Sequence, residues 1–251
     1  MRMQYCSDLH LEYERNNRYV SANLLKVSGE ILILAGDIVP LHDEHMNSPF
    51  FRFIAENYQQ VYWVPGNHEY YYHDIAGYGS SMNIEIHPRI RIVNNVAVEY
   101  AGVQLIFSTM WSKISPANER LIEQGMADFG CITYKSKKFR ASDFNRLHEE
   151  GLDFLNKVVQ QQQRPFIVVT HHLPSPCVVH AFIKSARSMR LFVLNKLNLW
   201  KEAMPVSGFM DTATATSPLF KLATQYLLTN QLGYVDLNEH GAYRRDAYLS
   251  V

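Results

Sequence analysis

Short apolar runs separate polar and aromatic segments along the chain. Four of these runs have the length of a strand and are rich in Val, Ile and Leu or in aromatic residues. They are Met1–Ser7, Glu30–Gly36, Val61–Gly66 and Pro165–Thr170. Runs of this kind are typical of strands that are buried on both faces of a sheet. The pattern therefore predicts an α/β fold that is built around these strands.

Helical patterns fill the intervals between the runs. We expect a loop and a short helix over Glu12–Ser28, and a second helix over Phe50–Tyr58 that leads into the third run. Ser142 can cap a longer helix that ends before Pro165. Its apolar face is formed by Phe144, Leu147, Leu152, Leu155, Val158 and Val159. The succession of strand, helix and strand at the start of the chain indicates parallel strands.

Antiparallel strands are expected in the middle of the chain and in its tail. Apolar and polar positions alternate over Arg91–Val98 as in a single strand, and a turn at Ala101-Gly102 leads into Val103–Phe107, which is the pattern of a hairpin. The tail over Gln225–Leu249 is interpreted as further short antiparallel strands. The whole pattern predicts a mixed sheet, or a pair of sheets, flanked by helices. At a length of 251 residues we expect one domain that covers residues 1–251.

The composition is that of an ordinary soluble globular protein. It is 47% hydrophobic and 19% charged, without a low-complexity tract, which argues against disorder. Lys and Arg equal Asp and Glu at 24 each, so no overall positive field would attract long nucleic acid or an anionic membrane. The three cysteines match no zinc-finger or CxxC spacing. Since no long apolar segment is present either, we expect a cytoplasmic protein that has no membrane partner.

Each of the four apolar runs ends on side chains that can bind a metal. These side chains belong to Asp8 and His10, to Asp37, to Asn67 and His68, and to His171 and His172. The ligand crevice of an open α/β sheet lies beyond the carboxyl ends of its strands, so we expect them to converge. Carboxylates together with imidazoles suit Mn, Fe or Zn better than Ca or Mg. Taken singly, each could instead be a helix cap or a polar loop residue, but the shared context at four strand ends favours a metal site.

Three long polar or aromatic segments follow these strands or lie beside them, and loops of this length usually shape a binding site. They are Pro40–Pro49, Tyr70–Pro88 and Trp111–Arg140. Tyr70 and Trp111 from these segments, together with His172, are our candidate substrate-binding residues. Packing in the interior is an alternative role for both aromatic residues.

Four short blocks of the sequence stand at the ends of the apolar runs. They are D-x-H at Asp8–His10, G-D at Gly36-Asp37, G-N-H-E at Gly66–Glu69 and H-x-x-P at His171–Pro174. In these blocks the chain resembles the calcineurin-like metallophosphoesterases, and the resemblance extends over nearly the whole chain. It implies a four-layer α/β/β/α sandwich of two mixed sheets flanked by helices, with a two-metal centre at the strand ends.

The resemblance also implies a role for each residue of the centre, with two divalent cations of Mn, Fe or Zn. The implied ligands are Asp8 and His10 for the first metal, Asp37 for both, and Asn67 and His171 for the second. His68 would be the catalytic histidine, which acts on the leaving group. The expected reaction is the hydrolysis of a phosphate monoester or diester by a metal-activated water. The expected partner is a phosphorylated small molecule or a nucleotide.

The last block of the family, G-H-x-H, has no match in this chain. Its counterpart by position is Gly208-Phe209-Met210-Asp211. Asp211 can still bind the first metal, whereas Phe209 cannot bind any metal, so the second site would be one ligand short and weaker. Water, a substrate oxygen, His172 or His180 could fill that position, unless the segment is only a loop outside the site. The alternative function is therefore a catalytically degenerate binding or regulatory protein that keeps the fold.

Overall fold

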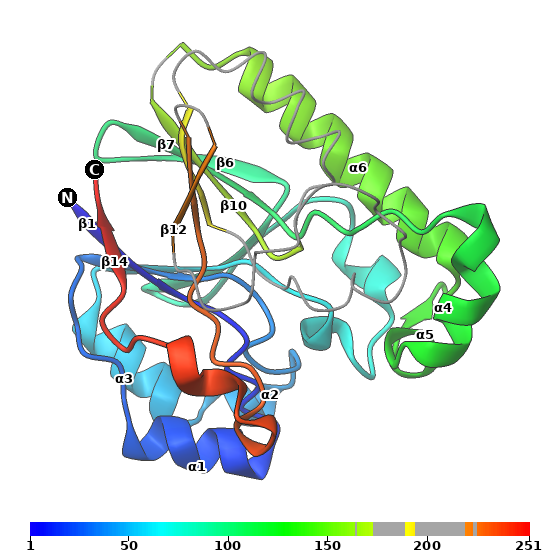
Figure 1. Cartoon of the computed structure of the whole chain (residues 1–251), viewed down its shortest axis with the longest axis horizontal. Coiled ribbons are helices and arrows are strands. Elements are labelled where there is room, and N and C mark those ends of the chain that lie inside the picture. Colours follow the sequence, from blue (N-terminus) through cyan, green and yellow to red (C-terminus); the bar gives the residue numbers. More distant parts are fainter. Residues whose placement is uncertain (164, 173–188, 194–218, 223–224) are drawn as a thin grey trace.

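Two mixed sheets of six strands each form the centre of the computed structural model, which describes residues 1–163, 165–172, 189–193, 219–222 and 225–251 (Figure 1). In order across the first sheet lie β14 (Tyr248–Ser250), β1 (Arg2–Cys6), β2 (Ile31–Leu34), β3 (Gln60–Trp63), β5 (Ile90–Asn94) and β4 (Met82–His87). In order across the second sheet lie β12 (Leu219–Leu222), β13 (Gln225–Leu228), β11 (Met189–Val193), β10 (Phe166–Thr170), β7 (Val103–Ser108) and β6 (Val96–Tyr100).

The remaining elements are helices and one small ribbon. The α-helices are α1 (Glu14–Ala22), α2 (Asp43–Met46), α3 (Pro49–Asn57), α4 (Glu119–Gly125), α5 (Asp128–Cys131) and α6 (Ala141–Gln160). The short 3₁₀ helices are η1 (His68–Tyr70), η2 (Ile75–Tyr78), η3 (Pro116–Asn118), η5 (Val235–Leu237) and η6 (Glu239–Ala242). The ribbon pairs β8 (Thr133–Tyr134) with β9 (Lys137–Lys138).

Parallel strands occupy the middle of both sheets. In the first sheet β1, β2, β3 and β5 are parallel, with β14 and β4 antiparallel at the edges. In the second sheet β7, β10, β11 and β13 are parallel, with β6 and β12 antiparallel at the edges. The carboxyl ends of the parallel strands within a sheet therefore lie along one edge, where a ligand crevice is expected.

The alternation of side chains along the strands divides the core into layers. Ile31 and Ile33 of β2 point into the core between the sheets, where they meet Phe107 of the second sheet. Leu32 and Leu34 point the other way, towards the helices. Burial of one such side chain contributes roughly 1.5 to 3 kcal/mol, so that both faces of this strand stabilise the fold.

Helices cover the outer faces of both sheets. Buried residues of α3, among them Phe51 and Ile54, pack on the first sheet together with Val20 of α1. Leu155 and Val159 of α6 pack on the outer face of the second sheet. Figure 1 shows α1 and α3 on one side of the two sheets and α6 on the other. The predicted arrangement of two mixed sheets between helical layers is confirmed, and a single domain over residues 1–251 stays a prediction.

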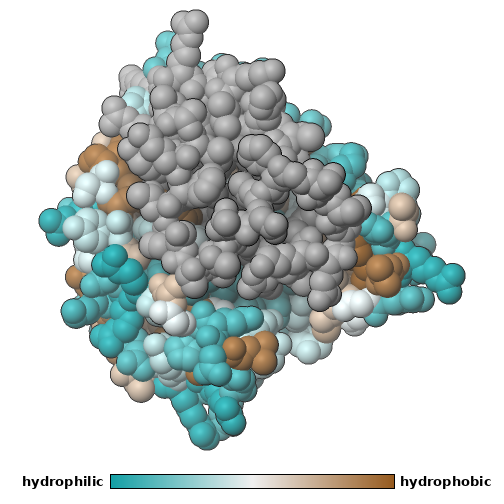
Figure 2. Space-filling view, in the orientation of Figure 1, coloured by the Kyte–Doolittle hydropathy of each residue, from teal (hydrophilic) through white to brown (hydrophobic). Residues whose placement is uncertain are grey.

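The described surface in Figure 2 is largely hydrophilic, with hydrophobic side chains scattered among the polar ones. Among the residues whose exposure the structure describes, Tyr72, Leu121 and Leu237 are the most exposed large hydrophobic ones, at 74%, 68% and 67%. Isolated apolar residues of this kind are normal on a protein surface. No helix in the described part of the chain has the length and apolar character needed to cross a membrane.

The four apolar runs form strands as predicted, and both early helices are present as α1 and α3. The predicted cap of the long helix was wrong. Arg140 is the N-cap of α6, and Ser142 lies inside the first turn. The Asp143 side chain accepts a hydrogen bond from the Arg140 N–H at 3.1 Å, so the helix start is fixed by a carboxylate inside the helix rather than by a hydroxyl before it.

The prediction of one continuous strand over Arg91–Val98 was also wrong. β5 ends at Asn94 in the first sheet, and β6 begins at Val96 in the second. Asn95 lies between them with φ 49°. Its side-chain oxygen accepts a hydrogen bond from Ser108 Oγ at 2.8 Å. Alternation with period two continues through this crossing, so the pattern alone does not show that the chain changes sheets. The hairpin of β6 and β7 is confirmed.

The tail agrees in part with its prediction. β14 pairs antiparallel with β1, which places the two ends of the chain side by side (Figure 1). β13 is antiparallel to β12 but parallel to β11. Gly233, which follows β13, has a positive φ of 69°, and the segment after it forms η5 and η6.

The layered packing predicts that an Ile→Val substitution lowers the free energy of unfolding by different amounts at a buried and at an exposed position. Ile33→Val in the core between the sheets, where the side chain is 0% exposed, should lower the free energy of unfolding by about 1 kcal/mol, because it leaves a small cavity. Ile84→Val on β4, where the side chain is 43% exposed, should change it by less than about 0.5 kcal/mol. Urea unfolding of both variants checks this, and equal costs would contradict the layer assignment.

Candidate functional site

Polar side chains that follow four parallel strands lie together at one end of the sheets. Asp8 and His10 follow β1, Asp37 follows β2, Asn67 and His68 follow β3, and His171 follows β10. Each is at most 4% exposed. The structure therefore brings together six of the residues that the sequence singles out, from two different sheets.

The Asp37 carboxylate lies at the centre of this cluster. Its Oδ2 is 3.8 Å from His10 Nε2, and its Oδ1 is 3.3 Å from His171 Nε2. The Oδ1 atom also accepts a hydrogen bond from the His68 backbone N–H at 3.1 Å. Asp8 Oδ1 is 3.8 Å from the same His10 nitrogen. Asp37 thus presents one oxygen to each of two imidazoles.

His171 and Asn67 form the second half of the cluster. His171 Nδ1 donates a hydrogen bond to the carbonyl oxygen of Ala35 at 3.0 Å. This contact places the proton on Nδ1, so Nε2 carries the lone pair that can bind a metal. That nitrogen is 3.3 Å from Asn67 Oδ1. An imidazole nitrogen, an amide oxygen and a carboxylate oxygen therefore face one another.

His10 provides the test of whether a cation fits the first half. Its Nε2 atom is buried and has no hydrogen-bond partner among the described residues. Ligand atoms of Asp8, His10 and Asp37 all lie within 4.8 Å of one another. Burial lowers the pKa of His10 below its usual value, although Glu12 and Asp37 oppose the shift, and this shift favours the neutral imidazole. Two buried carboxylates beside a neutral imidazole are costly without a positive charge, and a divalent cation fits this donor set.

The loops that carry the candidate ligands Asp8, His10 and Asp37 adopt an unusual backbone. Asp8, His10 and Asp37 have φ values of 50°, 47° and 54°, in the left-handed region that non-glycine residues rarely adopt. Such residues cost about 1 to 3 kcal/mol each and concentrate at functional sites. Hydrogen bonds between the two loops oppose this cost: Asp8 N–H donates to the Gly36 carbonyl at 2.9 Å, and His10 N–H donates to the Asp37 carbonyl at 3.0 Å.

Two glycines leave room for the imidazole of His171. A Cβ at Gly36 would lie 2.3 Å from His171 Nδ1, and a Cβ at Gly66 would lie 2.2 Å from Asp37 Oδ1 and 2.6 Å from His171 Nε2. Gly36 also has φ 91°, which favours glycine. The glycines of the G-D and G-N-H-E blocks are therefore required because the cluster is packed directly against their backbone.

The Glu69 side chain connects the loop that contains Asp37 with the loop that contains Gly66. Its carboxylate accepts hydrogen bonds from the backbone N–H groups of Asp37, Ile38 and Gly66 at 3.0, 2.7 and 2.6 Å. It also accepts one from the Trp63 indole at 2.9 Å. Burial and the Asp37 carboxylate raise the pKa of Glu69 to about 7, against the effect of these donors. The sequence block contains Glu69, but only the fold reveals that it positions the loops.

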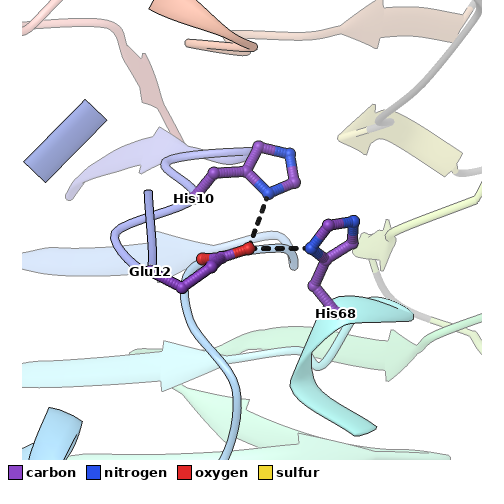
Figure 3. A group of neighbouring side chains, drawn as sticks. All are labelled: His10, Glu12 and His68. Atoms are coloured by element: carbon purple, nitrogen blue, oxygen red, sulfur yellow. Dashed lines mark hydrogen bonds and ion pairs between the residues drawn. The ribbon is translucent and has the colours of Figure 1, made fainter. Parts of the chain in front are cut away.

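Glu12 bridges two histidines of the site and was not singled out from the sequence (Figure 3). Its Oε1 accepts hydrogen bonds from His68 Nδ1 at 2.8 Å and from His10 Nδ1 at 3.3 Å. Burial acts to raise the pKa of Glu12, but the two histidine hydrogen bonds outweigh it and hold the pKa below its usual value. The only signal for this role in the sequence is the position of Glu12 two residues after His10.

A cavity of about 290 Å³ opens beside the cluster. Its described lining consists of Asp8, His10, Asn67, His68, Tyr71, Gly125, Met126, Ala127, Asp128, Gln231, Gly233, Tyr234 and Glu239. The Tyr234 ring stacks on His10 at a centroid distance of 4.6 Å, and the Tyr71 ring stacks on His68 at 4.2 Å. Aromatic rings therefore hold both imidazoles at the edge of the cavity.

The candidate substrate-binding residues lie apart from the described lining of this cavity. Trp111 is 3% exposed and Tyr70 is 2% exposed, with ring centroids 6.0 Å apart. The His172 ring lies 5.4 Å from Trp111 and 6.3 Å from Phe144. The three form a packed group with Phe144, so a substrate-binding role for them stays a prediction. Asp211, proposed from the sequence as a ligand of the first metal, lies outside the described residues, as do Phe209 and His180.

The chain belongs to the calcineurin-like phosphoesterase family, whose model matches residues 1–202. This confirms the class of protein predicted from the four sequence blocks, a family of metal-dependent phosphoesterases. The match ends before Gly208, so the segment that replaces the last block of the family lies beyond it.

Two individual proteins are similar to this chain over nearly its whole length. An uncharacterized protein of Acanthamoeba polyphaga mimivirus is 28% identical over 280 residues, which cover 99% of this chain and 96% of that protein. The crystal structure of phosphopantetheinyl hydrolase from Mycobacterium tuberculosis has a TM-score of 0.60 at 15% identity, and covers 97% of this chain and 93% of that chain. The second likeness shows that the two proteins share a fold.

The buried donor set predicts that metal binding stabilises the fold. With free Mn²⁺ at about 100 times its dissociation constant, the free energy of unfolding should rise by about 2.7 kcal/mol. Asp37→Asn should reduce this gain to less than about 1 kcal/mol, since it removes a carboxylate that both halves share. Asp153→Asn, on the exposed face of α6, is the matched control and should keep the full gain. Thermal unfolding with and without Mn²⁺ measures the effect, and an equal gain in the Asp37 variant would contradict the assignment.

Proposed function

We propose that the protein is a metal-dependent hydrolase of phosphate monoesters or diesters, which uses two divalent cations of Mn, Fe or Zn. The observation that carries the proposal is the Asp37 carboxylate, whose two oxygens face His10 on one side and His171 on the other. Family membership supports a metal-dependent phosphoesterase in general. The position of Asp37 between the His10 and His171 imidazoles supports the further proposal that two cations bind.

The proposed ligands follow from the two halves of the cluster. Asp8, His10 and Asp37 would hold the first cation, and Asp37, Asn67 and His171 the second. Asp211 is proposed as a further ligand of the first. When bound, such cations supply a nucleophilic water at neutral pH and neutralise charge on the phosphoryl oxygens. Because Phe209 replaces a histidine of the family pattern, the second cation should bind more weakly than the first.

His68 is proposed as the group that assists departure of the leaving oxygen. Its Nδ1 donates to Glu12 at 2.8 Å, so its Nε2 is the nitrogen that can give a proton to the leaving alkoxide. The negative charge of Glu12 stabilises the protonated imidazole, and the Tyr71 ring stacked on His68 fixes its plane. General acid catalysis of this kind contributes about 10² to 10⁴ in rate.

The proposed substrate is a phosphorylated small molecule or a nucleotide. A cavity of about 290 Å³ lies at the small end of the range for small-molecule sites. The tyrosines at its edge offer apolar faces to an organic group. The similar solved structure is named a phosphopantetheinyl hydrolase; at 15% identity this supports hydrolysis in general and no particular substrate.

A second candidate function is binding of a phosphorylated ligand without turnover. The observation that favours it is Gly208-Phe209-Met210-Asp211 in place of G-H-x-H, which leaves the second cation one ligand short. Both candidates require the same fold and the same first metal. They differ in whether the native chain hydrolyses the phosphorylated ligand that it binds.

Hydrolysis of 4-nitrophenyl phosphate and bis(4-nitrophenyl) phosphate with Mn²⁺ tests the proposal. We expect turnover by the native chain and a loss of roughly 100-fold or more in Asp37→Asn, because a ligand of both cations is removed. Asp153→Asn should remain as active as the native chain. Absence of turnover in the native chain, together with its appearance in Phe209→His, would overturn the proposal in favour of the binding protein.

The Glu12 contact predicts an effect that depends on the leaving group. Glu12→Gln should lower kcat about 10-fold or more for an alkyl phosphate, whose poor leaving group needs a proton. It should lower kcat much less for 4-nitrophenyl phosphate, which leaves without one. Glu56→Gln, exposed on α3, is the matched control. Equal losses on both substrates would contradict an action through His68 and would place the effect on His10 and the metal.

A further inference from the structure

Asp128 of α5 lies in the wall of the cavity, and its carboxylate is buried at 2% exposure. Its Oδ1 accepts hydrogen bonds from Asn67 Nδ2 and from the Tyr71 hydroxyl, both at 2.8 Å. The Tyr71 hydroxyl in turn accepts a hydrogen bond from Asn67 Nδ2 at 3.3 Å. The three side chains thus form a closed set of hydrogen bonds, here called the amide clamp (Asn67, Tyr71 and Asp128).

The amide clamp has a chemical consequence for Asn67. A side-chain amide has one acceptor end and one donor end, and an ionised carboxylate can only accept. If the amide were flipped, its oxygen would lie 2.8 Å from another acceptor oxygen, that of Asp128. Asp128 therefore selects the orientation in which Asn67 Oδ1 lies 3.3 Å from His171 Nε2. A metal cation binds the amide through this oxygen and not through the NH₂ group.

The segment that carries Asp128 is fixed to the loop that carries Tyr71. The Tyr72 N–H donates to the Cys131 carbonyl at 2.7 Å, and the Thr133 N–H donates to the His73 carbonyl at 3.0 Å. These backbone contacts hold α5 against the residues that follow the G-N-H-E block. The position of Asp128 relative to Asn67 is therefore set by main-chain contacts, even though the two residues are 61 positions apart in sequence.

We propose that Asp128 is a positioning residue for the second cation, acting through the amide of Asn67. This inference rests on the proposed function, because it requires a cation beside Asn67. By holding the NH₂ end, Asp128 directs the oxygen towards His171 and Asp37 before the metal binds. Outer partners of this kind change metal affinity by about 10 to 100-fold. The segment between β7 and α6 then contributes to the metal centre, although it contains no ligand itself.

Equilibrium dialysis of Mn²⁺ against the full chain tests the proposal through a double-mutant cycle. Asp128→Asn should raise the dissociation constant of the weaker Mn²⁺ site by about 10 to 100-fold. In an Asn67→Ala background the same change should alter it by less than about two-fold, because the group through which Asp128 acts is gone. Asp153→Asn is the control for loss of one negative charge and should leave both sites unchanged.

A second variant keeps the test possible if the Asp128→Asn chain does not fold. If Asp128→Asn does not fold, as judged by metal-free thermal unfolding, Tyr71→Phe replaces it in the same cycle, since it removes one member of the clamp and keeps the carboxylate. It should weaken the same site by a smaller factor in the native background and have no effect in the Asn67→Ala background.

The outcomes separate this inference from the proposed function. Unchanged Mn²⁺ affinity in a folded Asp128→Asn chain overturns the inference, as do equal losses in both backgrounds, which would show that Asp128 acts by its charge alone. Coupling in the cycle without turnover by the native chain supports the inference and overturns the proposed function. Turnover by the native chain without coupling in the cycle supports the proposed function and overturns the inference. A native chain that binds no Mn²⁺ overturns the inference and the proposed function.

Discussion

The buried Asp37 carboxylate is the constraint on which the rest of the site depends. It is 0% exposed, and it lies near two further carboxylates, those of Asp8 and Glu69. Without compensation a charge in this position is strongly unfavourable. The protein compensates part of this charge through the His68 backbone N–H, which donates to Asp37 Oδ1. The Nε2 atoms of His10 and His171 that face Asp37 carry lone pairs and leave the rest of the charge uncompensated. A divalent cation bound as proposed would supply the remainder.

The packing of the two sheets sets the dimensions of the site. Asp37 follows a strand of the first sheet and His171 follows a strand of the second. Their approach to 3.3 Å requires that the core between the sheets keep a fixed thickness and that Gly36 and Gly66 add no side chain between them. Close-packed interiors deform little, and the strained turns at Asp8 and Asp37 are held by hydrogen bonds between the loops. Core residues outside the site therefore determine the distance between the Asp37 and His171 side chains.

The sequence predicts the parts of this arrangement that depend on one strand at a time. Apolar runs give the strands, and a polar residue at the end of a run gives a candidate ligand such as Asp37, because parallel strands end at the same edge. It does not predict Glu12 or Asp128, since their contacts arise where a loop or an inserted helix meets the site. The continuous strand expected over Arg91–Val98 failed for a related reason: period-two alternation is the same in both sheets, and only the side-chain contacts of Asn95 show where the chain crosses.

Three of the proposed metal ligands are held by a partner on the side that faces away from the cluster. His10 is held by Glu12, His171 by the Ala35 carbonyl and Asn67 by Asp128. The donor atoms are thus oriented by the protein alone, and a cation that enters loses little free energy to ordering them. This bears on the missing histidine at position 209. A site assembled by its cation would lose both a ligand and the order that the ligand imposes, whereas here the remaining donors keep their positions. If the proposed two-cation site forms, Phe209 in place of the family's histidine would remove one ligand bond, which water or a substrate oxygen would replace.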